Sequence, residues 1–240
     1  MKYDILAFGA HPDDVELGCG GTIAKSLSQN KKIAIIDITR GELGTRGNVN
    51  TRNKESSKAN KILGINHREN LDLKDGFFKN DKNSQLIVIS KIREFKPDIV
   101  LCNASEDRHI DHGKGSDLVN DSCFLSGLKK IKTFDLNNSR QDVWRPKIVL
   151  EYIQWNEVKP DFIFDISGYL EIKLDAVKAY SSQLFNPNSS ESETPISSKN
   201  FIESVSYRAK NMGRLINSEA GEGFNSRQIL SISDLDSFLK

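Results

Sequence analysis

The sequence predicts an α/β protein with a mostly parallel sheet flanked by helices, followed by a C-terminal extension of further strands and helices. One observation is that short apolar runs rich in branched side chains, typical of buried strands, alternate with longer segments of helical pattern. Another is that residues 3–8, 17–27 and 32–38 resemble a strand, a glycine-rich helix and a second strand. This order is a βαβ unit, which implies a parallel strand pair with a right-handed crossover.

The later elements follow in chain order. A polar helix is expected over residues 51–63, and Gly64 is a natural C-terminal cap for it. A helix over residues 84–95 is ended by Pro97, and a strand is expected at residues 98–103. The remaining expected elements are a helix at 114–128, strands at 148–153 and 162–166, helices at 170–182 and 201–216, a loop at 185–199, and a short strand and helix within the last 20 residues.

Length and composition are those of an ordinary globular protein. The 240 residues are 37% hydrophobic and 28% charged, and neither a repeat nor a linker divides them, so we expect a single domain over residues 1–240. A net charge of +1 gives no reason to expect nucleic acid or a membrane as a partner. Cys19, Cys102 and Cys123 lack a Cys-x-x-Cys spacing, so we expect reduced thiols and a cytoplasmic location.

The first chemical cluster directly follows the first predicted strand and contains His11, Pro12, Asp13 and Asp14. In open α/β sheets, ligands bind just beyond the carboxyl ends of the strands. Pro12 fixes its own φ and restricts the residue before it, which makes this turn stiff. The segment therefore has the position and the rigidity that a ligand site needs.

A second cluster follows the third predicted strand and contains His109, Asp111 and His112. Because the carboxyl ends of parallel strands lie at the same edge of a sheet, we expect the two clusters to converge. A catalytic zinc site uses three protein ligands and leaves one position open. We expect His11, Asp14 and His112 to be those ligands.

The remaining side chains of the two clusters have expected catalytic roles. Asp13 lies beside the ligands and is expected to take a proton from the attacking water as a general base. His109, in protonated form, is expected to stabilise a developing oxyanion or to deliver a proton to the leaving group. Asp111 is expected to orient an imidazole and to raise its basicity.

Simpler interpretations exist for each motif alone. A single His-Pro-Asp-Asp segment is usually a capped turn. A dinucleotide-binding motif would need a third glycine where the chain has Ile23, so Gly18, Gly20 and Gly21 more plausibly let a helix approach the sheet closely. His67 has no acidic cluster around it and is expected to be a surface or packing residue. A non-catalytic metal-binding or nucleotide-binding protein is the alternative from another class.

Residues 10–14 together with residues 109–112 resemble the zinc-dependent N-acetylglucosamine deacetylases of the PIG-L/LmbE family. In much of that family a glutamate directly follows the second aspartate, whereas here Val15 comes before Glu16. This departure is similar to the branch identified as bacillithiol biosynthesis deacetylases. Further segments similar to that branch are residues 39–47, 75–78, 106–109, 123–128 and 193–197.

The resemblance implies a Rossmann-like hydrolase that removes acetate from N-acetylglucosaminyl malate in bacillithiol biosynthesis, and a homo-oligomer, often a hexamer. It also implies the same three zinc ligands, with Asp13 as base and with His109, supported by Asp111, as the electrostatic or acid partner. Ferrous iron is the alternative metal in the cell, because imidazole and carboxylate ligands accept both ions.

Malate carboxylates need cationic hosts, for which the bidentate fork of arginine is well suited. The expected substrate-binding residues are Glu42, which could accept hydrogen bonds from sugar hydroxyls, and the arginines Arg46, Arg52 and Arg108. The alternative activities are a general N-acetylglucosamine-type deacetylase and an amidase acting on thiol conjugates.

Overall fold

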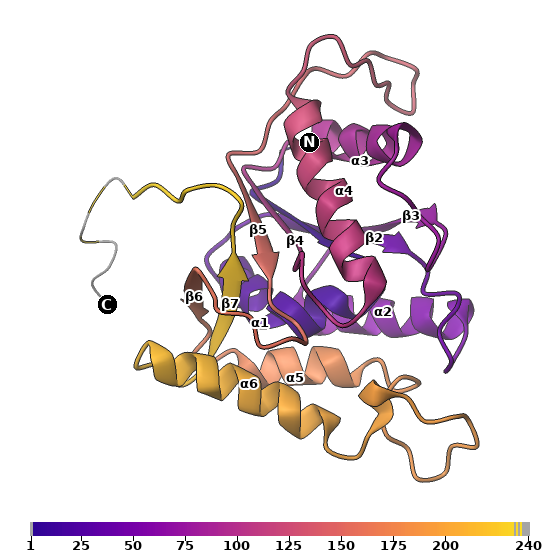
Figure 1. Ribbon diagram of the computed structural model, residues 1–240, viewed down its shortest axis with the longest axis vertical. Helices are drawn as coiled ribbons and strands as arrows, with labels where there is room; N and C mark the ends of the chain where they lie inside the picture. The colour runs from indigo at the N-terminus through magenta and orange to yellow at the C-terminus, as the bar shows by residue number, and fades with distance from the viewer. Residues whose placement is uncertain (1, 233, 235, 237–240) are drawn as a thin grey trace.

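The computed structural model describes residues 2–232, 234 and 236, and these residues form a seven-stranded sheet (Figure 1). The strands are β1 (Ile5–Gly9), β2 (Ile33–Thr39), β3 (Arg68–Leu73), β4 (Ile99–Asn103), β5 (Ile148–Tyr152), β6 (Phe162–Asp165) and β7 (Gly221–Asn225). Their order in the sheet is β3-β2-β1-β4-β5-β7-β6. β1 to β5 pair in parallel, and β7 runs antiparallel to both β5 and β6. The predicted α/β fold with a mostly parallel sheet is confirmed.

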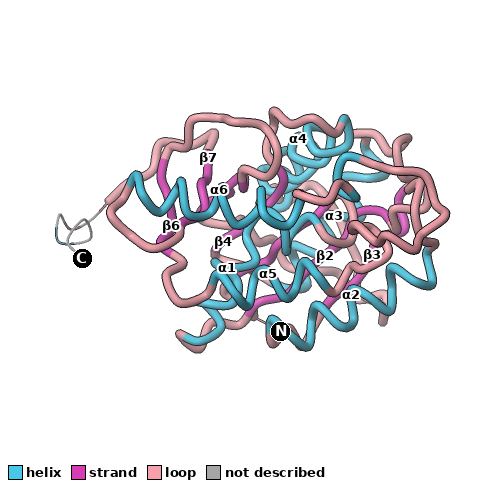
Figure 2. The backbone as a smooth tube through the Cα atoms, turned by 90° about the horizontal axis from the view of Figure 1, so that it is seen from below, coloured by secondary structure: helices cyan, strands magenta, loops and turns pink. Residues whose placement is uncertain are grey.

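Helices cover both faces of this sheet (Figure 2). They are α1 (Asp14–Ser28), α2 (Val49–Leu63), α3 (Lys82–Phe95), α4 (Ile110–Ser126), α5 (Leu170–Lys178) and α6 (Phe201–Leu215), with a short 3-10 turn at Pro195–Ser197. Alternate residues of β1 point to opposite faces, where Ala7 packs with α1, α2 and α5, and Phe8 packs with α3 and α4. α6 packs on α5 and β7 at the outside of the first helix layer. None of the described helices combines the length and the apolarity needed to cross a lipid bilayer.

The glycine-rich helix begins earlier than expected. α1 begins at Asp14, three residues before the expected start, so the glycines lie nearer its middle, where the helix kinks at Cys19 (φ −141°). A Cβ atom on Gly18 would lie 2.1 Å from the ring of Tyr152, and one on Gly21 would lie 2.6 Å from Ile166. The expected close approach is therefore confirmed at these two positions. Close approach does not require a glycine at position 20, because a Cβ atom there would lie 3.4 Å from Lys173, at an ordinary van der Waals distance.

Other differences concern weakly patterned segments. β3 is not among the expected strands, because Arg68–Leu73 begins with two charged residues and an asparagine and has no apolar run. It lies at the edge of the sheet, and none of its residues is fully buried. α4 begins at Ile110, four residues before the predicted start, because His109 acts as its N-terminal cap. The short strand expected near the C-terminus is β7. The helix expected after it lies partly outside the described residues.

The order in which successive strands are added to the sheet changes side between β1 and β4, which are themselves parallel. From β1 the chain continues to β2 and β3 on one side, and then returns to β4 and β5 on the other. In doubly wound sheets the loops on the two sides of such a point diverge and leave a crevice at the carboxyl ends of the strands. The first chemical cluster follows β1, and the second follows β4.

Candidate metal centre and substrate cavity

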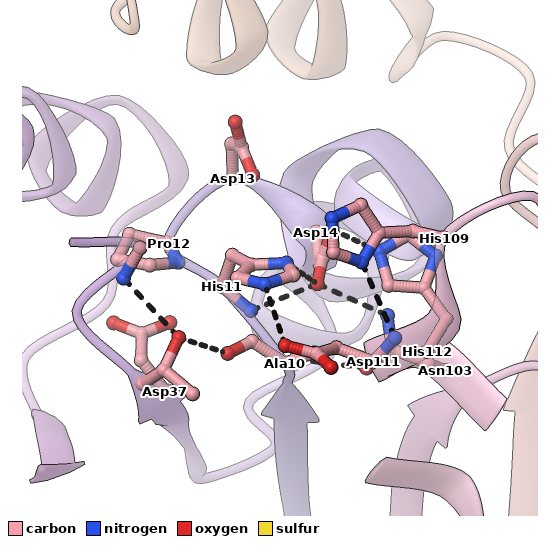
Figure 3. A network of polar contacts seen from close by, with 12 residues as sticks. Ala10, His11, Pro12, Asp13, Asp14, Asp37, Asn103, His109, Asp111 and His112 are labelled. Atoms are coloured by element: carbon pink, nitrogen blue, oxygen red, sulfur yellow. Dashed lines mark hydrogen bonds and ion pairs between the residues drawn. The ribbon is translucent and has the colours of Figure 1, made fainter. Parts of the chain in front are cut away.

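The structure brings the two predicted clusters together. The rings of His11 and His112 have centroids 5.8 Å apart, and His109 lies 4.6 Å from His11 (Figure 3). The carboxylate of Asp14 lies between the two predicted histidine ligands. Its Oδ2 is 3.5 Å from Nδ1 of His11, and its Oδ1 is 3.1 Å from Nε2 of His112.

Each of these two imidazoles has one nitrogen held by a second carboxylate. Nε2 of His11 lies 3.0 Å from Oδ1 of Asp75, and Nδ1 of His112 lies 3.0 Å from Oδ2 of Asp107. The other nitrogen of each ring therefore faces Asp14. A carboxylate behind the imidazole is the usual arrangement around a metal, because it fixes the ring and increases the electron density on the ligating nitrogen.

The charges in this cluster suit a cation. Burial lowers the pKa of His11, but hydrogen bonds that its ring donates to Asp111, Asp14 and Asp75 raise this pKa well above its usual value. Burial also lowers the pKa of His112, but Asp14 and Asp107 outweigh this effect and raise the pKa to about 9. The pKa of Asp14 is held well below its usual value by these imidazoles, against the effect of burial. Several carboxylates thus surround two imidazoles, and this surplus of negative charge fits a divalent cation.

Among the residues that the structure describes, two groups of side chains have ligand atoms close enough to share one ion. They are His11, His109 and His112, and His11, Asp75 and Asp111. Both include His11, which places it at the centre of the candidate site. The first group makes His109 a further neighbour of an ion at this position.

Asp13 has an unusual backbone and a defined partner. Its φ of 116° lies in the left-handed region, which costs energy for a residue with a Cβ. Its side chain is turned away from His11 (Figure 3), and Oδ2 lies 2.9 Å from Nη2 of Arg52. Burial raises the pKa of Asp13 to about 7, with the charge of Arg52 acting against it. Arg52 also donates to the carbonyl of Pro12.

The expected pairing of Asp111 with His109 needs correction. The carboxylate of Asp111 instead accepts from the backbone N–H of Gly76 at 2.6 Å and from Lys114 at 3.1 Å, and lies 3.5 Å from Nε2 of His11. Nδ1 of His109 accepts the backbone N–H of Asp111 at 3.3 Å. Burial, and then the charges of His11 and His112, lower the pKa of His109, which disfavours the protonated form that we expected.

A cavity of about 660 Å³ opens from this cluster, within the range of small-molecule sites. Asp13, Arg52 and Arg108 line it, whereas Glu42 and Arg46 are not among its lining residues. The opposite wall comes from the segment after β5, the 3-10 turn, α6 and β7, and includes Ile153, Gln154, Trp155, Ile196, Phe201, Arg208 and Met212.

The two predicted substrate residues outside the cavity support its loops. Oε1 of Glu42 accepts the backbone N–H of Asp75 at 3.0 Å, which holds the loop that carries a partner of His11. The buried side chain of Arg46 lies 3.7 Å from Glu191. Glu16 is also structural, because it pairs with Arg68 at 2.6 Å and accepts from Tyr180 at 3.0 Å beneath the site.

Sequence reasoning assigned no site role to several residues. Asp75 and Asp107 lie within segments that carried the family resemblance, and Asp107 also lies in an acidic loop after a predicted strand, which was a further signal. Gln154 follows the end of β5, which is the same kind of position. Arg208 had no such signal, because it lies within α6, far along the chain from both clusters.

Fold and site together define an α/β protein with a candidate histidine–aspartate metal centre at the carboxyl edge of its sheet. Residues 6–123 match the family model described as "PIG-L: GlcNAc-PI de-N-acetylase". This segment, just under half of the chain, has the sequence pattern of the PIG-L family of deacetylases. The chain is similar to the diacetylchitobiose deacetylase of Thermococcus kodakarensis, with 28% identity over 189 residues, which cover 75% of this chain and 69% of that protein.

Solved structures share the fold over almost the whole chain. The conserved protein TT1542 from Thermus thermophilus superposes with a TM-score of 0.84 at 29% identity, covering 96% of this chain and 98% of that one. The N,N'-diacetylchitobiose deacetylase from Pyrococcus horikoshii has a TM-score of 0.80 at 23% identity, covering 97% of this chain and 88% of that one. At that identity the second likeness concerns the fold alone.

Proposed function

We propose that this protein is a zinc-dependent N-deacetylase that acts on an N-acetylated amino sugar, with N-acetylglucosaminyl malate as its substrate. The observation that carries the proposal is the arrangement of His11, Asp14 and His112, with a carboxylate behind each imidazole, at the end of a cavity that Asp13 also lines. The match to the family model and the likeness to the diacetylchitobiose deacetylase of Thermococcus kodakarensis support the reaction class.

His11, Asp14 and His112 would hold the cation, which when bound supplies Lewis acidity toward the acetyl carbonyl. Asp13 takes the proton of the attacking water as the C–O bond forms. It then passes that proton to the sugar nitrogen as the C–N bond breaks, so that acetate and a free amine leave. A pKa of Asp13 raised toward neutrality by burial suits a group that must both accept and release a proton.

His109 acts in this proposal as a neutral hydrogen-bond donor. Because its Nδ1 accepts the N–H of Asp111, the neutral ring carries its proton on Nε2. That N–H is the group available to the developing oxyanion. A donor placed in advance stabilises the charge of the transition state without reorganisation.

The malate part of the substrate is proposed to lie near Arg108. Among the described residues the guanidinium of Arg108 forms no ion pair, and its side chain lines the cavity. The guanidinium of Arg108 lies 4.5 Å from the ring centroid of Trp155, which leaves its charge beside the cavity. Arg52 is less suited to the carboxylates, because it is already paired with Asp13 and Pro12.

The test is an assay of the purified protein with N-acetylglucosaminyl malate and with plain N-acetylglucosamine, with acetate and free amine measured separately. We expect both products in equal amounts from the malate conjugate, and a much lower kcat/KM with the plain sugar. Equal rates with both would favour the general sugar deacetylase, and acetate release from neither would overturn the proposal. Removal of the metal with a chelator should abolish activity, and added Zn²⁺ or Fe²⁺ should restore it.

Two further properties belong to the same proposal. The family resemblance supports a homo-oligomer, and large exposed apolar side chains such as Phe77 (74% exposed) could pack between copies. Light scattering after gel filtration would measure the mass. The buried thiols of Cys19, Cys102 and Cys123 support a cytoplasmic location.

A further inference from the structure

The candidate ligand Asp14 is braced by a side chain outside both predicted clusters. Gln154, which follows β5, donates from Nε2 to Oδ1 of Asp14 at 2.8 Å. Asn103, at the end of β4, donates from Nδ2 to Oδ2 of Asp14 at 3.1 Å. Two amides from neighbouring strands therefore hold one carboxylate, and its direction toward His112 depends on them.

Gln154 is in turn held by α6. The two terminal nitrogens of Arg208 donate to the backbone carbonyls of Gln154 and Trp155. The planar guanidinium suits two adjacent acceptors, whereas a lysine offers only a single point charge. Arg208 thus fixes the backbone that carries the amide, and this links α6 to a ligand at the opposite wall of the cavity.

We propose that Gln154 is a positioning residue for the metal ligand Asp14, and that Arg208 acts through Gln154. The inference rests on the proposed metal centre. A carboxylate whose lone pairs are fixed by an amide donor loses less freedom when a cation binds. Removing such a partner typically costs about 10- to 100-fold in metal affinity.

The experiment measures affinity for Zn²⁺ alone, by competition with a chromophoric chelator, and the visible spectrum of the Co²⁺-substituted protein. The variants are Gln154→Met, Arg208→Met and the double variant. Methionine has nearly the volume of glutamine but no N–H donor. Gln183→Met is the matched control, because Gln183 also lines the cavity but donates to Arg46 and Ser182 instead.

We expect Gln154→Met to weaken Zn²⁺ binding by about 10- to 100-fold and to change the Co²⁺ spectrum. The melting temperature of the metal-free variant should stay within about 5 °C of the wild type, because only the two hydrogen bonds of this side chain, to Asp14 and from Asn103, are lost. Arg208→Met should weaken binding by a smaller factor. In the double variant the affinity should equal that of Gln154→Met within about twofold, since Arg208 acts only through Gln154.

Each outcome has a separate meaning. Wild-type affinity in Gln154→Met, or an equal loss in Gln183→Met, would overturn the positioning role. Additive losses in the double variant would overturn the link from Arg208 through Gln154. A wild-type protein that binds neither Zn²⁺ nor Co²⁺ would instead contradict the metal centre and with it the proposed function.

Discussion

Two regions of the molecule meet at the cavity, and they are built differently. The chemical region, residues 5–126, contains β1 to β4 and provides the three histidines of the site together with Asp13 and Asp14. The wall region, residues 148–225, contains the antiparallel strands, α5 and α6, and provides Trp155, Phe201 and Arg208.

The two regions also differ in the interactions that hold their cavity-lining side chains. Side chains of the chemical region hold one another through buried hydrogen bonds, such as that between His11 and Asp75. Those of the wall region pack through rings, as Trp155 stacks with Phe201 at 6.0 Å. We therefore expect changes in the chemical region to stop the reaction. Changes in the wall region, apart from those at Gln154 and Arg208, should alter stability or substrate binding.

The largest expected effect is that of His112→Ala. Because a catalytic metal site needs three protein ligands, this variant should retain less than about one tenth of the wild-type metal and lose activity. Elemental analysis after desalting measures the metal. His67→Ala is the matched control, since His67 packs against the rings of Tyr3 and Phe95 and should keep its metal. Full metal content in His112→Ala would contradict the ligand assignment.

Asp13→Asn should lower kcat by roughly 10²- to 10⁴-fold while the metal content stays unchanged, because only the general base is lost. Asparagine tolerates the positive φ of this position, so the fold should be kept. Asp72→Asn is the control, since Asp72 also has a positive φ but is exposed. The measurement is steady-state kinetics on variant and wild-type samples with equal metal content. An unchanged kcat in Asp13→Asn would show that another group is the base.

The third-largest expected effect is that of Glu222→Gln, and it concerns the stability of the fold rather than the reaction. Glu222 of β7 accepts from Lys173 at 2.6 Å and from two backbone N–H groups of the kinked α1. Glu222→Gln should lower the free energy of unfolding by roughly 3 kcal/mol, because the ammonium of Lys173 is left buried without its counter-charge. Denaturant titration measures this. The exposed Glu219→Gln should have almost no effect, and an equal loss there would refute the explanation.

The smallest expected effect is that of Trp155→Ala in the wall region. Loss of this ring should raise KM by about five- to tenfold, equivalent to about 1 to 1.4 kcal/mol, with a smaller change in kcat. Initial rates over a range of substrate concentrations separate the two constants. Trp144→Ala should leave KM unchanged, because Trp144 donates to Pro97 away from the cavity. A fall in kcat with constant KM would assign Trp155 to the chemical region instead.

More of the structure and of the site could be predicted from the sequence in the chemical region than in the wall region. Its strands are short apolar runs, and its reactive residues follow these strands directly, so local patterns were enough to place His11 and His112 at one edge. β3 escaped this reasoning because an edge strand is only half-buried and lacks the apolar run. The wall region has little local signal, since Arg208 contacts residues about fifty positions earlier in the chain.

By itself, the sequence determined the α/β architecture, the positions of the two clusters and the identity of the candidate ligands. These follow from periodicity and from turn chemistry, which act over a few neighbouring residues. Only the tertiary structure decided which carboxylate supports which imidazole, that Arg52 pairs with Asp13, and that Asp111 serves His11 rather than His109. Such pairings depend on side-chain directions after packing, and residues far apart in the chain carry no local signature of them.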